Sequence, residues 1–169
     1  RRRIMATTAL GGTPVQTNSD LPAAGSAAPD FLLIGTDLGE KTLADFAGKK
    51  KILTINPSYD TGVCASAART FNQRAASLDD VVVLVISGDL PFAQKRFCVA
   101  EGLEGVVPLS TFRSTFLEDY GVKLVESKMK GLAARAIVVL DENDNVVHTE
   151  LVPDIGQEPD YDAAIAAVS

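Results

Sequence analysis

Short apolar runs bounded by turn residues recur along most of the chain and have the length of β-strands. The run at 81–86 is continuously apolar, which is typical of a strand covered on both faces. Two strand-like segments flank Gly11-Gly12 and predict a small hairpin within about residues 5–18. Further strands are expected at 31–34, 51–55, 81–86, 106–109, 136–140 and 146–151.

Amphipathic stretches between these runs predict helices. Ala68, Phe71 and Ala75 recur on one face of the stretch that follows Cys64. In the next stretch, Asp89 can cap a helix, Pro91 suits its first turn and Gly102 ends it. Helices are therefore expected at 64–78, 89–101, 114–120 and 160–168, with a short helical turn at 42–46.

The order of these elements predicts the fold class. Strands and helices alternate as far as residue 120, which implies parallel pairing through right-handed crossovers. The last two strands, joined by residues 141–145, form a hairpin and add antiparallel pairing. We therefore expect a single α/β domain over residues 1–169, with a mixed central β-sheet flanked by helices.

Composition and charge limit the partners and the cellular compartment that can be expected. The net charge of −6 disfavours a nucleic-acid or anionic-membrane partner, because both demand a basic surface. A basic cluster, Arg1-Arg-Arg3, precedes Met5; we assign it no function and regard residues 1–4 as a candidate expression remnant. Since the chain offers no apolar run of membrane-spanning length and no convincing signal peptide, a cytoplasmic, reducing compartment is expected.

Cys64 is the most informative residue. It follows a strand-like run and a loop, and a helix-like run leaves it, so its thiol falls in the first turn of a helix. Unpaired backbone N–H groups and the helix dipole favour a negative charge there. The thiolate is the reactive form of cysteine. The alternative for Cys64 is a small buried hydrophobe, as most free cysteines are.

A histidine base for this thiol is not expected. The single histidine, His148, lies in an alternating segment that predicts an exposed strand residue. One histidine and two cysteines are also too few for a typical zinc site. An arginine is the better candidate, and Arg135 stands out because it begins an apolar strand where a charge needs a partner. A solvent-reaching Arg135 is the alternative, and Arg69 and Arg113 are weaker candidates.

Other candidates surround the thiol or share its chemistry. Pro57 lacks an N–H and fixes the loop before Cys64. Thr61 offers a hydroxyl three residues before Cys64 and can also cap the helix. Cys98 lies in the second predicted helix, so the two cysteines form a candidate redox couple, with an inert buried thiol as the alternative for Cys98.

These motifs resemble one family. Pro57-x-x-x-Thr61-x-x-Cys64 is similar to the signature of the peroxiredoxins, and the block from Asp89 to Cys98 resembles the bacterial thiol peroxidase group of atypical two-cysteine peroxiredoxins. Asn56 and Tyr59 stand where more aliphatic or aromatic residues are expected. Further matching segments are Ala100-Glu-Gly102, Leu109-Ser-Thr-Phe-Arg113, Lys130-Gly-Leu-Ala-Ala-Arg-Ala136 and Glu158-Pro-Asp-Tyr161.

The resemblance implies a thioredoxin fold with an extra N-terminal β-hairpin. It also implies an antioxidant enzyme that reduces hydroperoxides without metal, haem or flavin, forms a homodimer and is reduced by thioredoxin. Cys64 would be the peroxidatic cysteine and Cys98 the resolving cysteine, joined in an intrachain disulfide. The remaining implied site residues are Pro57, Thr61 and Arg135 as the shell of Cys64.

Three residues are candidates for the peroxide-binding pocket. The backbone N–H groups near Val63 would help to stabilise the leaving oxygen. Met129 and Leu132 lie near Arg135 in the sequence and could form an apolar rim, with ordinary core packing as the alternative. Two other functions stay open at this stage, namely a thiol–disulfide oxidoreductase that does not reduce peroxides and a non-catalytic redox sensor.

Overall fold

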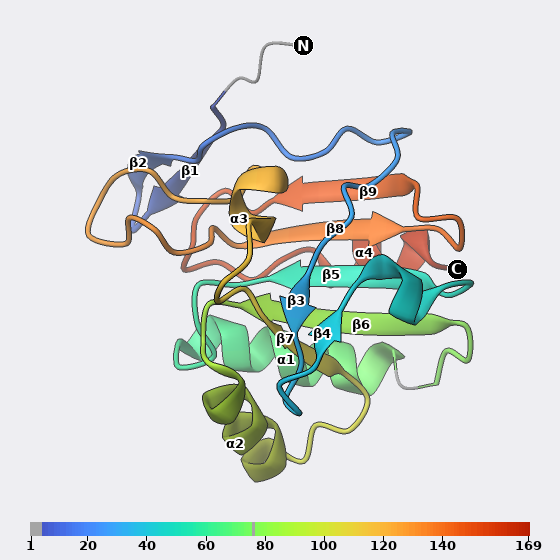
Figure 1. Ribbon diagram of the computed structural model, residues 1–169. Helices are drawn as coiled ribbons and strands as arrows, with labels where there is room; N and C mark the ends of the chain where they lie inside the picture. Colours follow the sequence, from blue (N-terminus) through green and yellow to red (C-terminus); the bar gives the residue numbers. More distant parts are fainter. Residues whose placement is uncertain (1–4, 76) are drawn as a thin grey trace.

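The computed structural model describes residues 5–75 and 77–169 of the 169-residue chain. It has a mixed seven-stranded sheet with helices on its faces and a separate two-stranded hairpin (Figure 1). The helices are α1 (Gly62–Ala75), α2 (Pro91–Glu101), α3 (Phe116–Asp119) and α4 (Tyr161–Ala167), with a 3₁₀ turn, η1, at Leu43–Phe46. The strands are β1 (Thr7–Leu10), β2 (Thr13–Gln16), β3 (Leu33–Ile34), β4 (Glu40–Lys41), β5 (Lys50–Ile55), β6 (Val81–Ser87), β7 (Val107–Ser110), β8 (Ala136–Leu140) and β9 (Val146–Leu151).

The sheet has the order β4-β3-β7-β6-β5-β8-β9. β5, β6 and β7 pair in parallel, because helices α1 and α2 provide the crossovers between them. β8 pairs antiparallel with β5, and β9 returns antiparallel beside β8. The predicted mixed sheet with a terminal hairpin of strands is therefore confirmed, and β1 and β2 form the predicted N-terminal hairpin.

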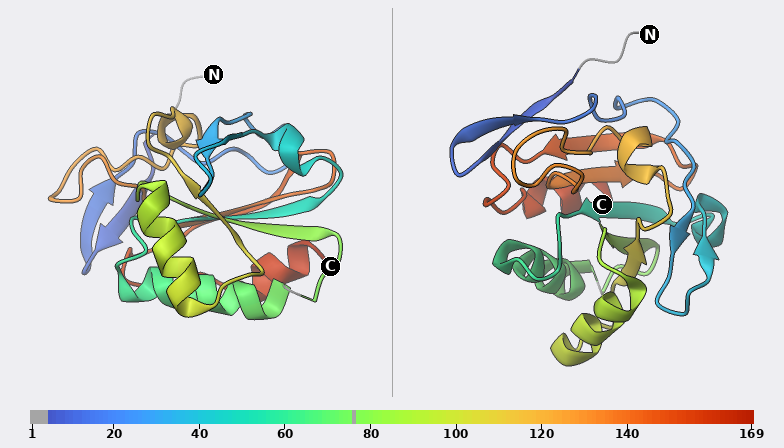
Figure 2. Two further views of the ribbon diagram at one scale, coloured as in Figure 1. Left: turned by 60° about the horizontal axis from the view of Figure 1, so that its bottom comes forward. Right: turned by 60° about the vertical axis from the view of Figure 1, so that its left-hand side comes forward.

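Apolar residues on the two faces of the sheet form two core layers. α1, α2 and α4 lie on one side, and Phe71 of α1 packs there with Val83 and Val139 (Figure 2). The 3₁₀ turn and α3 lie on the other side, where Phe116 packs on Leu53 and Leu84. Since both faces of β5, β6 and β8 are covered, the loops that leave these strands are fixed by a rigid centre.

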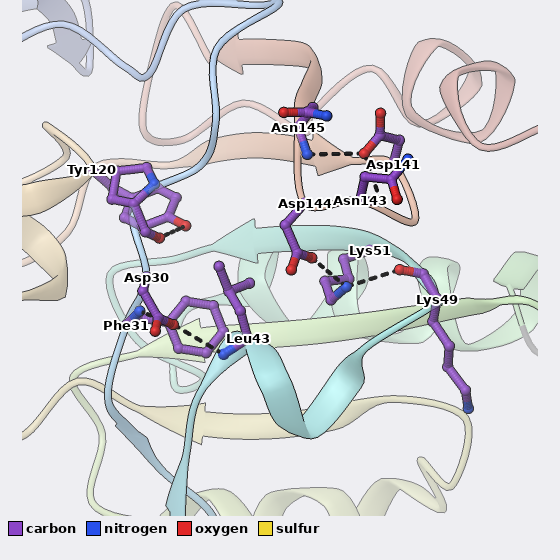
Figure 3. A network of polar contacts seen from close by, with 11 residues as sticks. Asp30, Phe31, Leu43, Lys49, Lys51, Tyr120, Asp141, Asn143, Asp144 and Asn145 are labelled. Atoms are coloured by element: carbon purple, nitrogen blue, oxygen red, sulfur yellow. Dashed lines mark hydrogen bonds and ion pairs between the residues drawn. The ribbon is translucent and has the colours of Figure 1, made fainter.

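A polar network closes one end of the second layer (Figure 3). The side chain of Lys51 is fully buried in β5, and its Nζ donates to the Asp144 carboxylate at 2.6 Å and to the Lys49 carbonyl at 2.9 Å. The Tyr120 hydroxyl donates to the Pro29 carbonyl at 2.7 Å. The Lys51–Asp144 contact holds the turn between β8 and β9 against the core, at the other end of β5 from Cys64.

Several element boundaries differ from the sequence-based expectation. The segment expected as a strand at 31–34 pairs only at Leu33–Ile34, and the short partner strand β4 was not predicted. α1 starts two residues earlier than expected, at Gly62. Asp89 was expected to cap α2, which is wrong: Leu90 is the N-cap residue, without a side-chain bond, and the Asp89 carboxylate is used elsewhere. Pro91 in the first turn and the left-handed Gly102 at the end are confirmed.

Two sequence-based expectations concern membrane spans and the terminus. None of the helices in the described ranges 5–75 and 77–169 is long and apolar enough to cross a membrane. Residues 1–4, regarded above as a candidate remnant, lie outside the described residues.

Candidate active site

The register of the central strands brings two distant polar residues together. Ile55 of β5 pairs with Ala136 of β8, so the next residues along these antiparallel strands, Asn56 and Arg135, lie opposite one another. Both side chains are buried. The Arg135 Nη1 donates to the Asn56 Oδ1 at 3.0 Å, and the Asn56 amide donates in turn to the Thr54 carbonyl at 3.0 Å. Strand pairing thus fixes the guanidinium at the carboxyl end of β5.

Cys64 lies in the first turn of α1, as the sequence predicted. Its backbone N–H donates to the Thr61 Oγ1 at 3.4 Å, so Thr61 makes the expected capping contact. The Thr61 hydroxyl itself donates to the Ser58 carbonyl at 3.0 Å. Pro57, which is buried, begins the loop between β5 and α1 and contributes no N–H to it. This loop therefore delivers the thiol to the end of the strand that carries Asn56.

The sulfur of Cys64 meets the arginine directly. The Arg135 Nη1 lies 3.0 Å from the Cys64 Sγ, and its Nε donates to the Ile155 carbonyl at 2.8 Å. Cys64 is 1% exposed and Arg135 is 2% exposed, so water screens their interaction weakly. The acceptors of Arg135 are a carbonyl, an amide oxygen and the sulfur; within the two described ranges no carboxylate forms an ion pair with it. Its charge is thus left to act on the sulfur.

Asp89 holds the loop before Cys64 in place. Its carboxylate accepts from the Ser58 hydroxyl at 2.8 Å, from the Tyr59 backbone N–H at 2.8 Å and from the Ser87 hydroxyl at 2.7 Å. Asp89 lies between β6 and α2, so one side chain ties the loop before α1 to the start of α2. This use of the carboxylate explains why it does not cap the helix.

The second cysteine is on α2 and is half-buried. Cys98 packs against the layer that contains Phe71 and Val83, and burial raises the pKa of its thiol to about 11. The neighbouring Phe97 contacts the Tyr59 ring at 4.8 Å between centroids. Burial, and then the nearby Cys98, Asp89 and Cys64, raise the pKa of Tyr59 well above its ordinary range. Tyr59 therefore lies within electrostatic reach of both thiols, which are free in this structure.

The other charged candidates lie away from Cys64. Arg69 is exposed and pairs with Glu101 at 2.9 Å, and the exposed Arg113 lies over the Phe112 ring at 5.1 Å. His148 was expected to be exposed, which is wrong, because it is half-buried. It pairs with Val139, four residues along β8 from Arg135, which is about 13 Å at strand spacing.

The predicted pocket residues are distributed differently. Val63 is half-buried beside Cys64 in the first turn of α1. Met129 packs on a small cluster that includes Ile155, the residue whose carbonyl holds Arg135. Leu132 is 40% exposed. Met129 thus packs in the cluster of Ile155, whose carbonyl binds Arg135, while Leu132 lies at the surface.

Sequence reasoning missed the partners that orient Arg135 and the loop. Asn56 was noticed only as an unexpected residue, and its role needed the register of β5 and β8. Asp89 was predicted to cap α2, whereas its carboxylate binds the loop before Cys64. Nothing in the sequence pointed to the Ile155 carbonyl. Within residues 5–75 and 77–169, no group of three or more His, Cys, Asp or Glu side chains forms a metal site.

Comparison with known proteins identifies the family of this chain. The Redoxin family model matches residues 23–165. The chain is 53% identical over 165 residues to a thiol peroxidase from Corynebacterium glutamicum, covering 98% of this chain and 100% of that protein. It is 54% identical over 164 residues to a thiol peroxidase from Mycobacterium bovis, covering 97% and 99%. A solved structure of a peroxiredoxin-like protein from Aquifex aeolicus superposes with a TM-score of 0.92 at 38% identity, covering 97% of this chain and 96% of that one.

These matches extend over nearly the whole chain, and they confirm the thioredoxin-like fold with its extra hairpin. The thiol and guanidinium that meet at the end of β5 come from segments inside the matched range. The chain therefore belongs to the Redoxin family, and within it to the peroxiredoxin-type thiol peroxidases.

Proposed function

We propose that Cys64 is the peroxidatic cysteine, which reduces hydrogen peroxide and organic hydroperoxides to water or alcohols. The observation that carries this proposal is the contact of 3.0 Å between the Arg135 guanidinium and the Cys64 sulfur, in a buried setting where no carboxylate competes for the charge among the described residues. A buried cation beside a helix N-terminus favours the thiolate over the thiol. Arginine then takes the part that a histidine has in other cysteine enzymes.

In the first step, the Cys64 thiolate attacks one oxygen of the hydroperoxide and the O–O bond breaks. The sulfur loses two electrons and becomes a sulfenic acid, while the other oxygen leaves as an alkoxide or hydroxide and takes up a proton. Negative charge moves from sulfur to the leaving oxygen, so fixed donors stabilise the transition state more than the ground state. We assign this task to Arg135 and to the first-turn N–H groups of Val63 and Cys64.

Thr61 and Pro57 have supporting roles in this proposal. In the observed state the Thr61 hydroxyl donates to the Ser58 carbonyl and accepts from the Cys64 N–H, which fixes the start of α1. Pro57 stiffens the loop that precedes it. We keep Met129 and Leu132 as candidates for an apolar rim; the packing of Met129 beside Ile155 supports its place near the site, and the exposure of Leu132 is compatible with an entrance.

In the second step, Cys98 attacks the Cys64 sulfenic acid, a disulfide forms within the chain, and water leaves. We infer that α2 partly opens in this step, because Cys64 is buried at the start of α1 and Cys98 is half-buried on a separate helix. The Tyr59–Phe97 contact and the Asp89 hydrogen bonds join the two segments and must loosen together.

The disulfide then has to be returned to two thiols. A thioredoxin-like dithiol would supply the two electrons and two protons by thiol exchange. We therefore infer thioredoxin as the reductant, the cytoplasm as the compartment, and antioxidant defence by a homodimer as the biological setting. The thiol peroxidase relatives support the peroxide chemistry, and the two free cysteines support an exchange cycle.

Single-turnover oxidation tests the assignment of both cysteines. Wild type, Cys64→Ser and Cys98→Ser are mixed with hydroperoxide, quenched at intervals and analysed by mass spectrometry. We expect a disulfide in wild type, no rapid oxidation in Cys64→Ser and a persistent sulfenate at Cys64 in Cys98→Ser. Rapid oxidation of Cys64→Ser at the wild-type rate would refute the proposal, and a Cys98→Ser variant that cycles normally with thioredoxin would remove Cys98 from it.

The same experiment separates the other two functions. A thiol–disulfide oxidoreductase would exchange disulfides but react slowly with hydroperoxide, and a sensor would form its disulfide without multiple turnovers. Steady-state consumption of hydroperoxide with thioredoxin, thioredoxin reductase and NADPH distinguishes an enzyme from a sensor. Replacing thioredoxin by glutathione with glutaredoxin tests the choice of reductant.

A further inference from the structure

The segment 152–156, which follows β9, is bound on one side to the N-terminal hairpin. The Thr8 hydroxyl donates to the Val152 carbonyl at 2.8 Å, and the Ile155 N–H donates to the Ala9 carbonyl at 2.8 Å. The Asp154 carboxylate accepts from the backbone N–H groups of the β1–β2 turn, at 2.8 Å from Gly12 and 3.4 Å from Gly11. The hairpin, far away in sequence, thus fixes this segment through several hydrogen bonds.

On its other side the same segment holds Arg135. The Ile155 carbonyl accepts from the Arg135 Nε at 2.8 Å, and the Val152 N–H donates to the Arg135 carbonyl at 3.0 Å. Ile155 is buried and packs with Val15 of the hairpin and with Ala134. Ile155 therefore binds the hairpin through its N–H and the guanidinium through its carbonyl.

We propose that the hairpin positions the Arg135 guanidinium against Cys64 through Asp154 and Ile155, which makes Asp154 a positioning residue of the active site. The proposal rests on the roles proposed above for Cys64 and Arg135. A guanidinium is planar and rigid, so the hydrogen bond at Nε sets the direction of the Nη1 that meets the sulfur. A small displacement of the Ile155 carbonyl would therefore turn Nη1 away from the Cys64 sulfur.

The contacts of Asp154 exceed those of an ordinary turn. Its carboxylate accepts from the Gly156 N–H at 2.9 Å, and Asp37 accepts in the same way from the Gly39 N–H at 2.9 Å, two residues further on. The pKa of each carboxyl is lowered, chiefly by that local N–H. Asp154 differs because it also receives the two N–H groups of the hairpin. Asp37 thus serves as a matched control, since it keeps the local turn contact without any link to Arg135.

Replacement of Asp154 tests the proposal. We expect Asp154→Ala to lower the second-order rate constant for Cys64 oxidation by hydroperoxide about tenfold, because catalytic groups held less firmly lose rate steeply. The ultraviolet absorbance of the Cys64 thiolate at neutral pH should fall with it. Asp37→Ala should change both quantities less than about twofold. In an Arg135→Met background, Asp154→Ala should cause no further loss.

The outcomes distinguish this proposal from the proposed function. An unchanged rate and absorbance in Asp154→Ala, or an equal loss with and without Arg135, would overturn the positioning role while leaving the function intact. An Arg135→Met variant as fast as wild type would overturn the proposed function itself. If circular dichroism shows that Asp154→Ala does not fold, Thr8→Val removes the hairpin's bond to the Val152 carbonyl instead. A loss of rate and absorbance that disappears in the Arg135→Met background is then the supporting result, and its absence overturns the proposal.

Discussion

Replacement of Arg135 by methionine removes the cation and keeps a side chain of similar length. At the Nη1–Sγ distance of 3.0 Å, a full charge pair corresponds to about 5.5 kcal/mol at an effective dielectric constant of about 20. Only the part of this energy that grows toward the transition state accelerates the reaction. Loss of one preorganised donor typically costs a factor of about 10²–10³, or about 3–4 kcal/mol. We expect the second-order rate constant for hydroperoxide to fall by this factor.

Rapid-quench oxidation followed by mass spectrometry of trapped Cys64 sulfenate measures that constant. Arg69→Met is the matched control, because Arg69 lies on the same helix as Cys64 but is exposed and paired with Glu101. The control should react within about twofold of wild type. Methionine fills a similar volume but leaves the Asn56 Oδ1 and the Ile155 carbonyl without this donor, so circular dichroism has to show that the variant folds. A folded Arg135→Met protein with less than about a threefold loss would refute the electrostatic argument.

Two further predictions concern the second thiol and the buried ion pair. In a Cys64→Ser background, alkylation of Cys98 should rise with pH toward a midpoint near 11, because burial raises the pKa of this thiol from its ordinary value of 9.0. The contribution of Cys98 to the free energy of unfolding is therefore present below about pH 9 and is lost as the pH rises through 11. An alkylation midpoint near 9.0 in the folded protein would contradict this. Asp144→Ala should lower the free energy of unfolding in urea by about 3–5 kcal/mol, because it leaves the fully buried Lys51 unpaired, whereas Lys51→Met should cost less, since the Asp144 side chain is 31% exposed; equal losses would contradict this asymmetry.

The fold was largely predictable because its strands are apolar and its turns carry strong signals. The run at 81–86 predicted a buried central strand, which β6 is, and the left-handed Gly102 ends α2 as expected. The short edge pairing of β3 with β4 was missed, because two-residue strands leave no periodic pattern. The start of α1 was also misjudged, because the capping contact of Thr61 rather than the hydrophobic period decides it.

The candidate site was predictable from the sequence where the residue type carries chemistry. Cys64 and Arg135 could be singled out because a thiol at a helix start and a charge among apolar residues each need an explanation. Asn56 could not, since an amide beside a strand end has many uses until the register places it opposite Arg135. The Ile155 carbonyl is a backbone group, which any residue could supply, so its contact with Arg135 depends on tertiary structure alone.

The two residues proposed to act with Cys64 differ in their structural support. Arg135 directly precedes β8, an inner strand that pairs with β5, whereas Cys98 lies on the helix α2, outside the sheet. A turnover can therefore disturb the outer helix while the inner scaffold keeps its shape. Each catalytic cycle would then begin from the same arrangement of the sheet and of the residues that it holds in place.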